Sequence, residues 1–298
     1  MEENVKIKNI KGVGYEPTTT VILDENYNEI NRITMKQNKS VKDGDPTENH
    51  DFIFIDDNHY IVSSYIFMHV DDVPSEMKKN GGKSGVVNCV IQEVKDDRVV
   101  WQWESIDHPE LYKDSVDHND YDNIEIKYAD YAHFNAMFID PTDDNLLCSF
   151  RNLDEILKLD RQNGNIIWTL GGKSDEFSLT AEQKFSRQHN VTITDDGSIL
   201  LYDNGVDNEQ SRAVKIKLDE QNKSILKYDE YKVDGEFYKA MGSAQQLDDE
   251  NDVYLICWGA KVGGNNKNVS EINFKTGETL FELSLDNHSP MYRVHKFK

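Results

Sequence analysis

Residues 130–205 of the chain read DYAHFNAMFIDPTDDNLLCSFRNLDEILKLDRQNGNIIWTLGGKSDEFSLTAEQKFSRQHNVTITDDGSILLYDNG. This stretch contains two short apolar runs that each begin at a histidine, His133 and His189, and a turn rich in Asp follows each run. The same phrase occurs earlier, where His50 begins HDFIFIDDNHYIVSS. Three histidines therefore recur at one position of a repeated unit. Equivalent residues of successive repeats face the same place in a repeat protein, so this position is a candidate site.

The pattern outside this stretch predicts an all-β chain. Helical periodicity is almost absent, and strands of four to seven residues alternate with turns of Asn, Asp and Gly. Units that start at residues 133, 189 and 243 are spaced by 56 and 54 residues. Residues 50–133 hold one such unit together with a polar, acidic rim insertion at about residues 105–130.

Repeated four-stranded units of this kind are typical of a β-propeller. We therefore expect residues 1–298 to form a single β-propeller domain of five or six blades. The C-terminal strand MYRVHKF has no unit of its own, so we expect it to pair with the N-terminal strands and close the ring. A β-sandwich is the alternative, but it gives no reason for the histidine phrase to recur.

The composition restricts the classes of partner. The chain has 33 basic and 55 acidic residues, a net charge of -22, which opposes binding to nucleic acid or to an anionic membrane. An anionic substrate would need a local cationic site. The start, MEENVKIKNIKG, lacks the apolar region of a signal peptide, so the expectation is a cytoplasmic protein unless a leader has been removed. Three widely spaced cysteines predict neither disulfides nor a thiolate metal site, and no cofactor is expected.

The spacing of the polar residues suggests a chemistry. Alternation along a strand would place His133 and Asn135 on one face, and a hairpin centred near position 142 would place Arg151 opposite His133. The innermost strands of a propeller line its channel, so we expect these residues to converge with His50 and His189 at one mouth. Imidazoles, a guanidinium and a carboxamide suit a tetrahedral oxyanion, and a neutral imidazole can act as a nucleophile. The pattern therefore favours transfer of a charged group.

Four phrases carry a resemblance to a known family, and they read DYAHFNAMFID, LLCSFRNLDEILKLD, GNIIWTLGG and FSRQHNVTITDDGSILLYDNG. They resemble the bacterial arylsulfotransferases, the aryl-sulfate sulfotransferases that work without phosphoadenosine phosphosulfate (PAPS), and the resemblance covers about residues 12–298. It implies a six-bladed β-propeller that moves a sulfuryl group from a phenolic sulfate ester to a phenol. The implied mechanism is ping-pong, through a sulfohistidine intermediate.

The resemblance also implies roles for individual residues. It makes His189 the nucleophile and gives His50 the role of a further donor or of the acid and base for the phenols. The sulfuryl oxygens would be held by His133, Asn135 and Arg151, and Ser243 of GSAQQ would line the pocket. Gram-negative members of the family carry a signal peptide and an extra N-terminal domain, and this sequence shows neither. Export, and a homo-oligomer formed through that domain, are therefore left open.

Two other functions compete with this interpretation. One is a propeller without catalysis that binds an anionic or aromatic ligand, or a protein partner, at the same channel mouth. The other is a metal-dependent hydrolase in which the three histidines are ligands.

Overall fold

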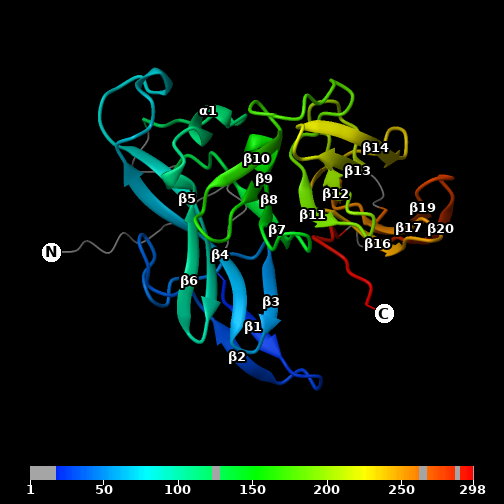
Figure 1. Ribbon diagram of the computed structural model, residues 1–298, viewed down its shortest axis with the longest axis horizontal. Coiled ribbons are helices and arrows are strands. Elements are labelled where there is room, and N and C mark those ends of the chain that lie inside the picture. The colour runs from blue at the N-terminus through cyan, green and yellow to red at the C-terminus, as the bar shows by residue number, and fades with distance from the viewer. Residues whose placement is uncertain (1–17, 123–127, 262–266, 286–288, 298) are drawn as a thin grey trace. The chain divides into compact units, whose positions relative to one another are not determined.

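The repeated sequence units form antiparallel sheets in which each strand pairs with the next (Figure 1). The structure is a computed structural model that describes residues 18–122, 128–261, 267–285 and 289–297. Within these residues there are four sheets of four strands and two sheets of two strands. The chain divides into two compact units, one that ends at His133 and one that begins at Phe134.

The first unit contains a hairpin, a four-stranded sheet and the rim insertion. The hairpin is β1 (Thr20–Leu23) and β2 (Glu29–Ile33), and the sheet is β3 (Phe52–Asp56), β4 (His59–Val70), β5 (Ser84–Lys95) and β6 (Arg98–Glu104). Two connections within the sheet, β3 to β4 and β5 to β6, are two-residue turns. Asp96 and Asp97 join β5 to β6 with φ angles of 50° and 61°, which is the left-handed backbone of a two-residue hairpin turn.

The rim insertion contains only short helical turns among its described residues. They are η2 (Ser105–Asp107) and α1 (Leu111–Asp114), and the turn η1 (Ser75–Met77) precedes them. Residues 123–127 of the predicted insertion lie outside the described residues. The apolar core of the first unit lies between the hairpin and the sheet and includes Ile33, Met35, Val41, Tyr60, Val62, Val90 and Val94.

The second unit contains three four-stranded sheets. The first is β7 (Phe134–Ile139), β8 (Leu146–Phe150), β9 (Glu155–Leu159) and β10 (Ile166–Gly171), and the turn η3 (Arg151–Leu153) lies between β8 and β9. The second is β11 (His189–Ile193), β12 (Ile199–Asp203), β13 (Arg212–Asp219) and β14 (Ser224–Lys232). The third is β16 (Ser243–Asp248), β17 (Val253–Cys257), β19 (Val269–Asn273) and β20 (Thr279–Leu283), and the short strands β15 (Tyr238–Ala240) and β18 (Ala260–Lys261) pair separately.

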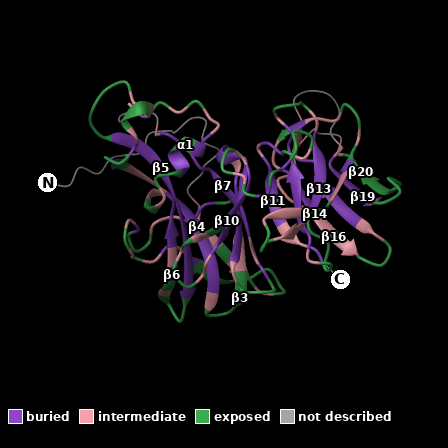
Figure 2. Ribbon diagram, turned by 45° about the horizontal axis from the view of Figure 1, so that its top comes forward, coloured by how far each residue is buried: buried purple, intermediate pink, exposed green. Residues whose placement is uncertain are grey.

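The sheets of the second unit pack on one another through their faces. Strands β7, β11 and β16, the first strands of the three sheets, are neighbours. One apolar cluster, which includes Trp168, Leu170 and Val214, joins the first sheet to the second, and another, which includes Tyr202 and Trp258, joins the second to the third. Strand β11 is buried over its first residues, whereas β20 is exposed along its whole length (Figure 2).

The Asp-rich turns that mark the repeat have a structural role. The Asp side chain accepts a backbone N–H two residues further on at Asp56, Asp140, Asp160 and Asp196. Such a bond closes the turn locally, which is why Asp is frequent there. The repeated Asp therefore shapes the hairpins.

The all-β prediction is confirmed, and sheets begin at or next to residues 133, 189 and 243 as expected. No closed ring is found among the described residues, so the six-bladed ring stays a prediction. The expected strand MYRVHKF is wrong, because residues 291–297 have no strand structure. Their backbone is instead bound by side chains at the start of β16, since Val294 N–H donates to Ser243 and Lys296 N–H donates to Gln245.

Candidate functional site

His50 and His133 are brought together in the first unit. His50 lies two residues before β3, and His133 is the last residue before β7. Their ring centroids are 5.1 Å apart in an edge-to-face arrangement. The ring of Tyr65 lies 5.9 Å from that of His50 and 5.8 Å from that of His133. Both histidines are buried, at 8% and 7% exposure, so a polar partner is required for each.

Each of these two histidines has a carboxylate at Nδ1. Glu48 bonds the ring of His50 and also accepts the His50 backbone N–H at 2.7 Å and the Ser63 hydroxyl at 2.5 Å. Asp130 Oδ2 lies 2.6 Å from Nδ1 of His133. Burial alone would raise the pKa of Glu48, but attraction to His50 and the hydrogen bonds outweigh burial and lower that pKa.

The argument from strand alternation does not hold for His133 and Asn135. His133 precedes β7 and has a φ of 53°, and the register of β7 shifts between Phe134 and Ala136. A left-handed residue followed by a bulge breaks the two-residue alternation of a strand. The hairpin register itself is as expected, because Phe134 pairs with Phe150 around position 142.

His189 opens β11 in the second unit, and its two ring nitrogens have different surroundings. Nδ1 lies 2.7 Å from Asn204 Oδ1 and 3.1 Å from the carbonyl oxygen of Arg187. Nε2 accepts the backbone N–H of Met241 at 3.3 Å. The ring of Tyr292 stands edge-on at 6.2 Å. Because Arg187 offers a carbonyl and Met241 an N–H, Nδ1 carries the proton and Nε2 the lone pair.

Asn135 is linked to the residue before His189. Its Nδ2 donates to the carbonyl oxygen of Gln188 at 2.8 Å, while its own Oδ1 is buried and has no hydrogen-bond partner in the structure. The backbone oxygen of Asn135 accepts bonds from Tyr292 at 3.4 Å and from Arg293 at 3.3 Å. The second unit therefore brings Asn135 and His189 into one neighbourhood with the C-terminal segment.

The other two predicted residues make hydrogen bonds elsewhere. Arg151 begins η3, is partly exposed, and donates to Asn152 Oδ1 at 2.7 Å. Ser243 begins β16 and accepts the Val294 N–H at 3.3 Å. Both lie in the second unit, at the starts of their elements. Convergence of His50, His133, Asn135, Arg151 and His189 at one channel mouth stays a prediction, as does the place of Ser243 in the pocket wall.

Sequence reasoning missed a buried ion pair before His189. The carboxylate of Asp154 accepts the Arg187 backbone N–H at 2.6 Å and lies 4.0 Å from its guanidinium. Burial raises the pKa of Asp154 to about 6, although the backbone hydrogen bond from Arg187 and the charge of its guanidinium both act to lower that pKa. Asp154, Arg187 and Asn190 all have positive φ angles. Such backbone strain is often found at functional sites, but no sequence pattern reveals it.

Other missed residues are the partners of the histidines and of Asn135, namely Glu48, Asp130, Asn204, Tyr292 and Arg293. Glu48 and Asp130 precede their histidines by two and three residues, so a search for nearby carboxylates would have found them. Asn204 lies 15 residues beyond His189, and the C-terminal pair is more than 100 residues away from it in the sequence. Only the fold identifies these three.

In the part of the chain that the structure describes, no three His, Cys, Asp or Glu side chains are grouped as they are around a metal ion. The described helices are all too short to cross a bilayer.

Comparison with known proteins gives one extensive match. The family model described as arylsulfotransferase (ASST) matches residues 16–293. No curated protein was matched.

Solved structures show only weak likeness. A protein of unknown function from Bacteroides caccae has a TM-score of 0.45 and 12% identity, over 94% of this chain and 95% of its own. The dihydro-heme d1 dehydrogenase NirN has a TM-score of 0.40 and 13% identity, over 94% of this chain and 45% of its own. The Dos1 propeller has a TM-score of 0.36 and 12% identity, over 93% of this chain and 66% of its own. These similarities are too low to support a conclusion about this chain.

Proposed function

The chain belongs to the arylsulfotransferase (ASST) family, and on this premise we propose that it transfers a sulfuryl group from an aryl sulfate ester to a phenol, with His189 as nucleophile. One observation supports the choice of His189 most directly. Its Nδ1 faces two oxygens that accept a proton, so the lone pair is on Nε2. A neutral imidazole with a lone pair on one ring nitrogen is the form that can attack sulfur.

In the proposed first step Nε2 attacks the sulfur of the donor. A nitrogen–sulfur bond forms, the bond from sulfur to the aryl oxygen breaks, and the phenolate departs with its electron pair. Phenols have a pKa of about 10, so a phenolate leaves with only modest help from an acid. The product on the enzyme is sulfohistidine, and the acceptor phenol reverses the step in a ping-pong cycle.

Charge on the sulfuryl oxygens is the main demand on the site. A loose transition state places that charge on three equatorial oxygens, so donors and positioning supply most of the catalysis. We assign this role to His133, Asn135 and Arg151. The Met241 N–H donates to Nε2 at 3.3 Å, so this hydrogen bond must break before Nε2 attacks. The Met241 N–H can then donate to a sulfuryl oxygen.

Proton transfer to and from the phenols is assigned to His50. Its Nδ1 is bonded to the carboxylate of Glu48, which orients the ring, and the imidazole can give a proton to the leaving phenolate and later take one from the acceptor. Ser243 is assigned to the pocket wall. The donor and acceptor are small molecules, and the proposal needs no PAPS.

The test measures transfer of the sulfuryl group from 4-nitrophenyl sulfate to phenol, and the released nitrophenol is the signal that is measured. Wild-type protein is expected to release nitrophenol continuously only when the acceptor is present. With donor alone it should release about one equivalent per protein, and mass analysis is then expected to find a sulfuryl group on His189. His189→Ala should reduce transfer to background while circular dichroism stays unchanged. His118→Ala, at an exposed position of the rim insertion, is the control and should retain full activity.

Each competing function has its own result in this assay. Activity close to normal in His189→Ala would refute the nucleophile. A silent wild-type protein would favour a propeller that only binds its ligand, and release that needs no acceptor and stops with a chelator would favour a metal-dependent hydrolase.

A further inference from the structure

The orientation of the Asn204 amide is determined by its neighbours. Its Nδ2 donates to the carbonyl oxygens of Tyr238 at 2.7 Å and Met241 at 2.9 Å. Carbonyl oxygens only accept, so a flipped amide would place its own oxygen against both of them. Oδ1 must therefore face His189, where it lies 2.7 Å from Nδ1. An amide oxygen can only accept, so Asn204 requires a proton on Nδ1.

We propose that Asn204 is a positioning residue that holds His189 as the neutral Nδ1–H imidazole, with its lone pair on Nε2. This inference rests on the proposed role of His189 as nucleophile. The other two histidines of the repeat provide the contrast, because their Nδ1 partners are the carboxylates Glu48 and Asp130. A carboxylate favours imidazolium, which has no lone pair, whereas an amide does not. The neutral partner occurs at the histidine that has to attack.

The same amide acts on both sides of the ring. Asn204 binds the carbonyl of Met241, and the N–H of Met241 faces Nε2 of His189. Met241 has a φ of 65°, an uncommon conformation for a residue with a side chain, and the bond from Asn204 helps to hold it. Asn204 therefore positions the donor at Nε2 as well as the acceptor at Nδ1.

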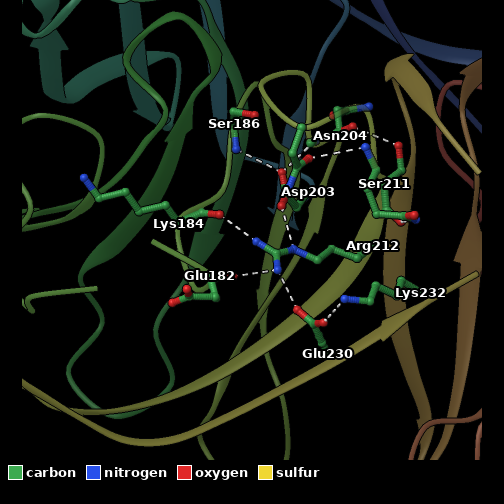
Figure 3. A network of polar contacts seen from close by, with 12 residues as sticks. Glu182, Lys184, Ser186, Asp203, Asn204, Ser211, Arg212, Glu230 and Lys232 are labelled. Carbon is green, nitrogen blue, oxygen red and sulfur yellow. Dashed lines mark hydrogen bonds and ion pairs between the residues drawn. The ribbon is translucent and has the colours of Figure 1, made fainter. Parts of the chain in front are cut away.

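A buried polar network fixes the position of Asn204 (Figure 3). Its backbone oxygen accepts the Ser211 hydroxyl at 2.8 Å, and Ser211 Oγ in turn accepts the Tyr238 N–H at 2.8 Å. The preceding residue, Asp203, accepts a bond from Arg212 Nε at 2.8 Å. Both ends of the Asn204 peptide are thereby anchored to β13.

Arg212 also holds the segment that leads into β11. Its guanidinium donates to the carbonyl oxygens of Glu182 at 2.8 Å and Lys184 at 2.6 Å, and Figure 3 shows these bonds on the side away from Asn204. Arg212 is buried, at 4% exposure, so these bonds are shielded from water. The network thus ties the start of β11, which carries His189, to the β12–β13 connection, which carries Asn204.

The test measures the ring directly, without turnover. Protein labelled with ¹⁵N at histidine gives long-range proton–nitrogen correlations that distinguish the Nδ1–H ring, the Nε2–H ring and imidazolium. The His189 signals are assigned by their loss in His189→Ala. We expect wild-type protein at neutral pH to show the Nδ1–H ring. An Nε2–H ring or imidazolium at His189 in the wild type would overturn the inference.

Two variants extend the test. Asn204→Ala removes the shorter acceptor at Nδ1 and the bond that holds the Met241 carbonyl, so we expect part of the His189 signal to shift from the Nδ1–H ring toward the Nε2–H ring and sulfuryl transfer to fall at least about 10-fold. Asn204→Asp offers Nδ1 a carboxyl oxygen but turns its second oxygen toward the carbonyl oxygens of Tyr238 and Met241, so both the ring and its surroundings change, and we expect altered ring signals and a similar fall. Ionisable neighbours do not change in either variant, since Tyr292 keeps its edge-on contact and Asp203 remains paired with Arg212.

Asn268→Ala is the matched control. Asn268 is fully buried, donates to Ser289 and accepts from Leu285, so its loss costs comparable hydrogen bonds without touching His189. Wild-type ring signals in Asn204→Ala would overturn the inference, as would the same altered signals in Asn268→Ala. An Nδ1–H ring that depends on Asn204 in a protein without sulfuryl transfer would support the inference and refute the proposed function.

Discussion

At the scale of single residues, the partner at Nδ1 distinguishes three histidines that share one sequence position. His50 and His133 bond carboxylates, and His189 bonds an amide. The amide therefore sets His189 apart from the other two histidines, because an amide is a neutral acceptor and a carboxylate is a charged one.

Asp154 gives a prediction at this scale. The pKa of Asp154 is about 6 in the folded protein, whereas an Asp carboxyl in the unfolded chain has a pKa of about 4. Between these two pH values the folded protein therefore keeps a proton that the unfolded chain has released. The stabilising contribution of this residue is therefore complete below about pH 4 and is lost as the pH rises through about 6. Relative to Asp154→Asn, the wild-type unfolding free energy should fall by about 2 kcal/mol over this range.

Urea unfolding of both proteins at several pH values checks this prediction. Asn tolerates the left-handed backbone of residue 154, so the comparison isolates the charge. Asp144→Asn, at an exposed residue with a φ of 61°, controls for backbone conformation and should run parallel to the wild type. If the unfolding free energy of Asp154→Asn depends on pH in the same way as that of the wild type, Asp154 does not titrate in this range.

At the scale of secondary-structure elements, a buried lysine links two sheets of the second unit. Lys158 of β9 has 1% side-chain exposure and bonds Asp140 at 2.8 Å and Asp143 at 2.8 Å. It also reaches Glu220, between β13 and β14, at 3.0 Å, and the indole of Trp168 donates to the same carboxylate. Burial alone would lower the pKa of Lys158, but the hydrogen bonds that it donates to three carboxylates outweigh burial and raise that pKa.

Lys158→Met should therefore destabilise the protein strongly. Removing one partner of a buried ion pair leaves uncompensated charge and costs about 3 kcal/mol. Lys227→Met is the control, because Lys227 is 63% exposed, and its pair with Asp229 is worth about 0.5 kcal/mol or less. Urea midpoints of the two variants give the comparison. Equal small losses in both would mean that the Lys158 cluster adds no net stability.

At the scale of the whole molecule, the net charge of -22 acts on any anionic donor. An aryl sulfate approaches against a repulsive field, and salt screens this field over about 8 Å at physiological ionic strength. We expect kcat/KM for 4-nitrophenyl sulfate to rise several-fold between about 10 mM and 150 mM NaCl. A neutral phenol acceptor should show almost no change.

Varying each substrate at saturating concentrations of the other separates these two effects. A fall of kcat/KM for the donor with salt would show that the local cationic groups dominate the field of the whole protein. Equal responses for donor and acceptor would point to an effect of salt on the protein itself.

The sequence alone determined the sheets and the repeated histidine position. Strand alternation and turn residues act between near neighbours, so the starts of the units at 133, 189 and 243 could be predicted. The carboxylates of His50 and His133 are also local in sequence, two and three residues away. Such features depend on short-range geometry, which the order of residues specifies.

The tertiary structure alone decided which residues surround His189. Asn204 reaches it across the β11–β12 hairpin, Met241 comes from the next sheet, and Tyr292 comes from the C-terminal segment. Tertiary structure also overruled the alternation at His133, where a left-handed residue precedes a bulge. The physical reason is that hydrogen bonds between distant residues depend on how sheets pack, and periodicity along the chain carries no information about that packing.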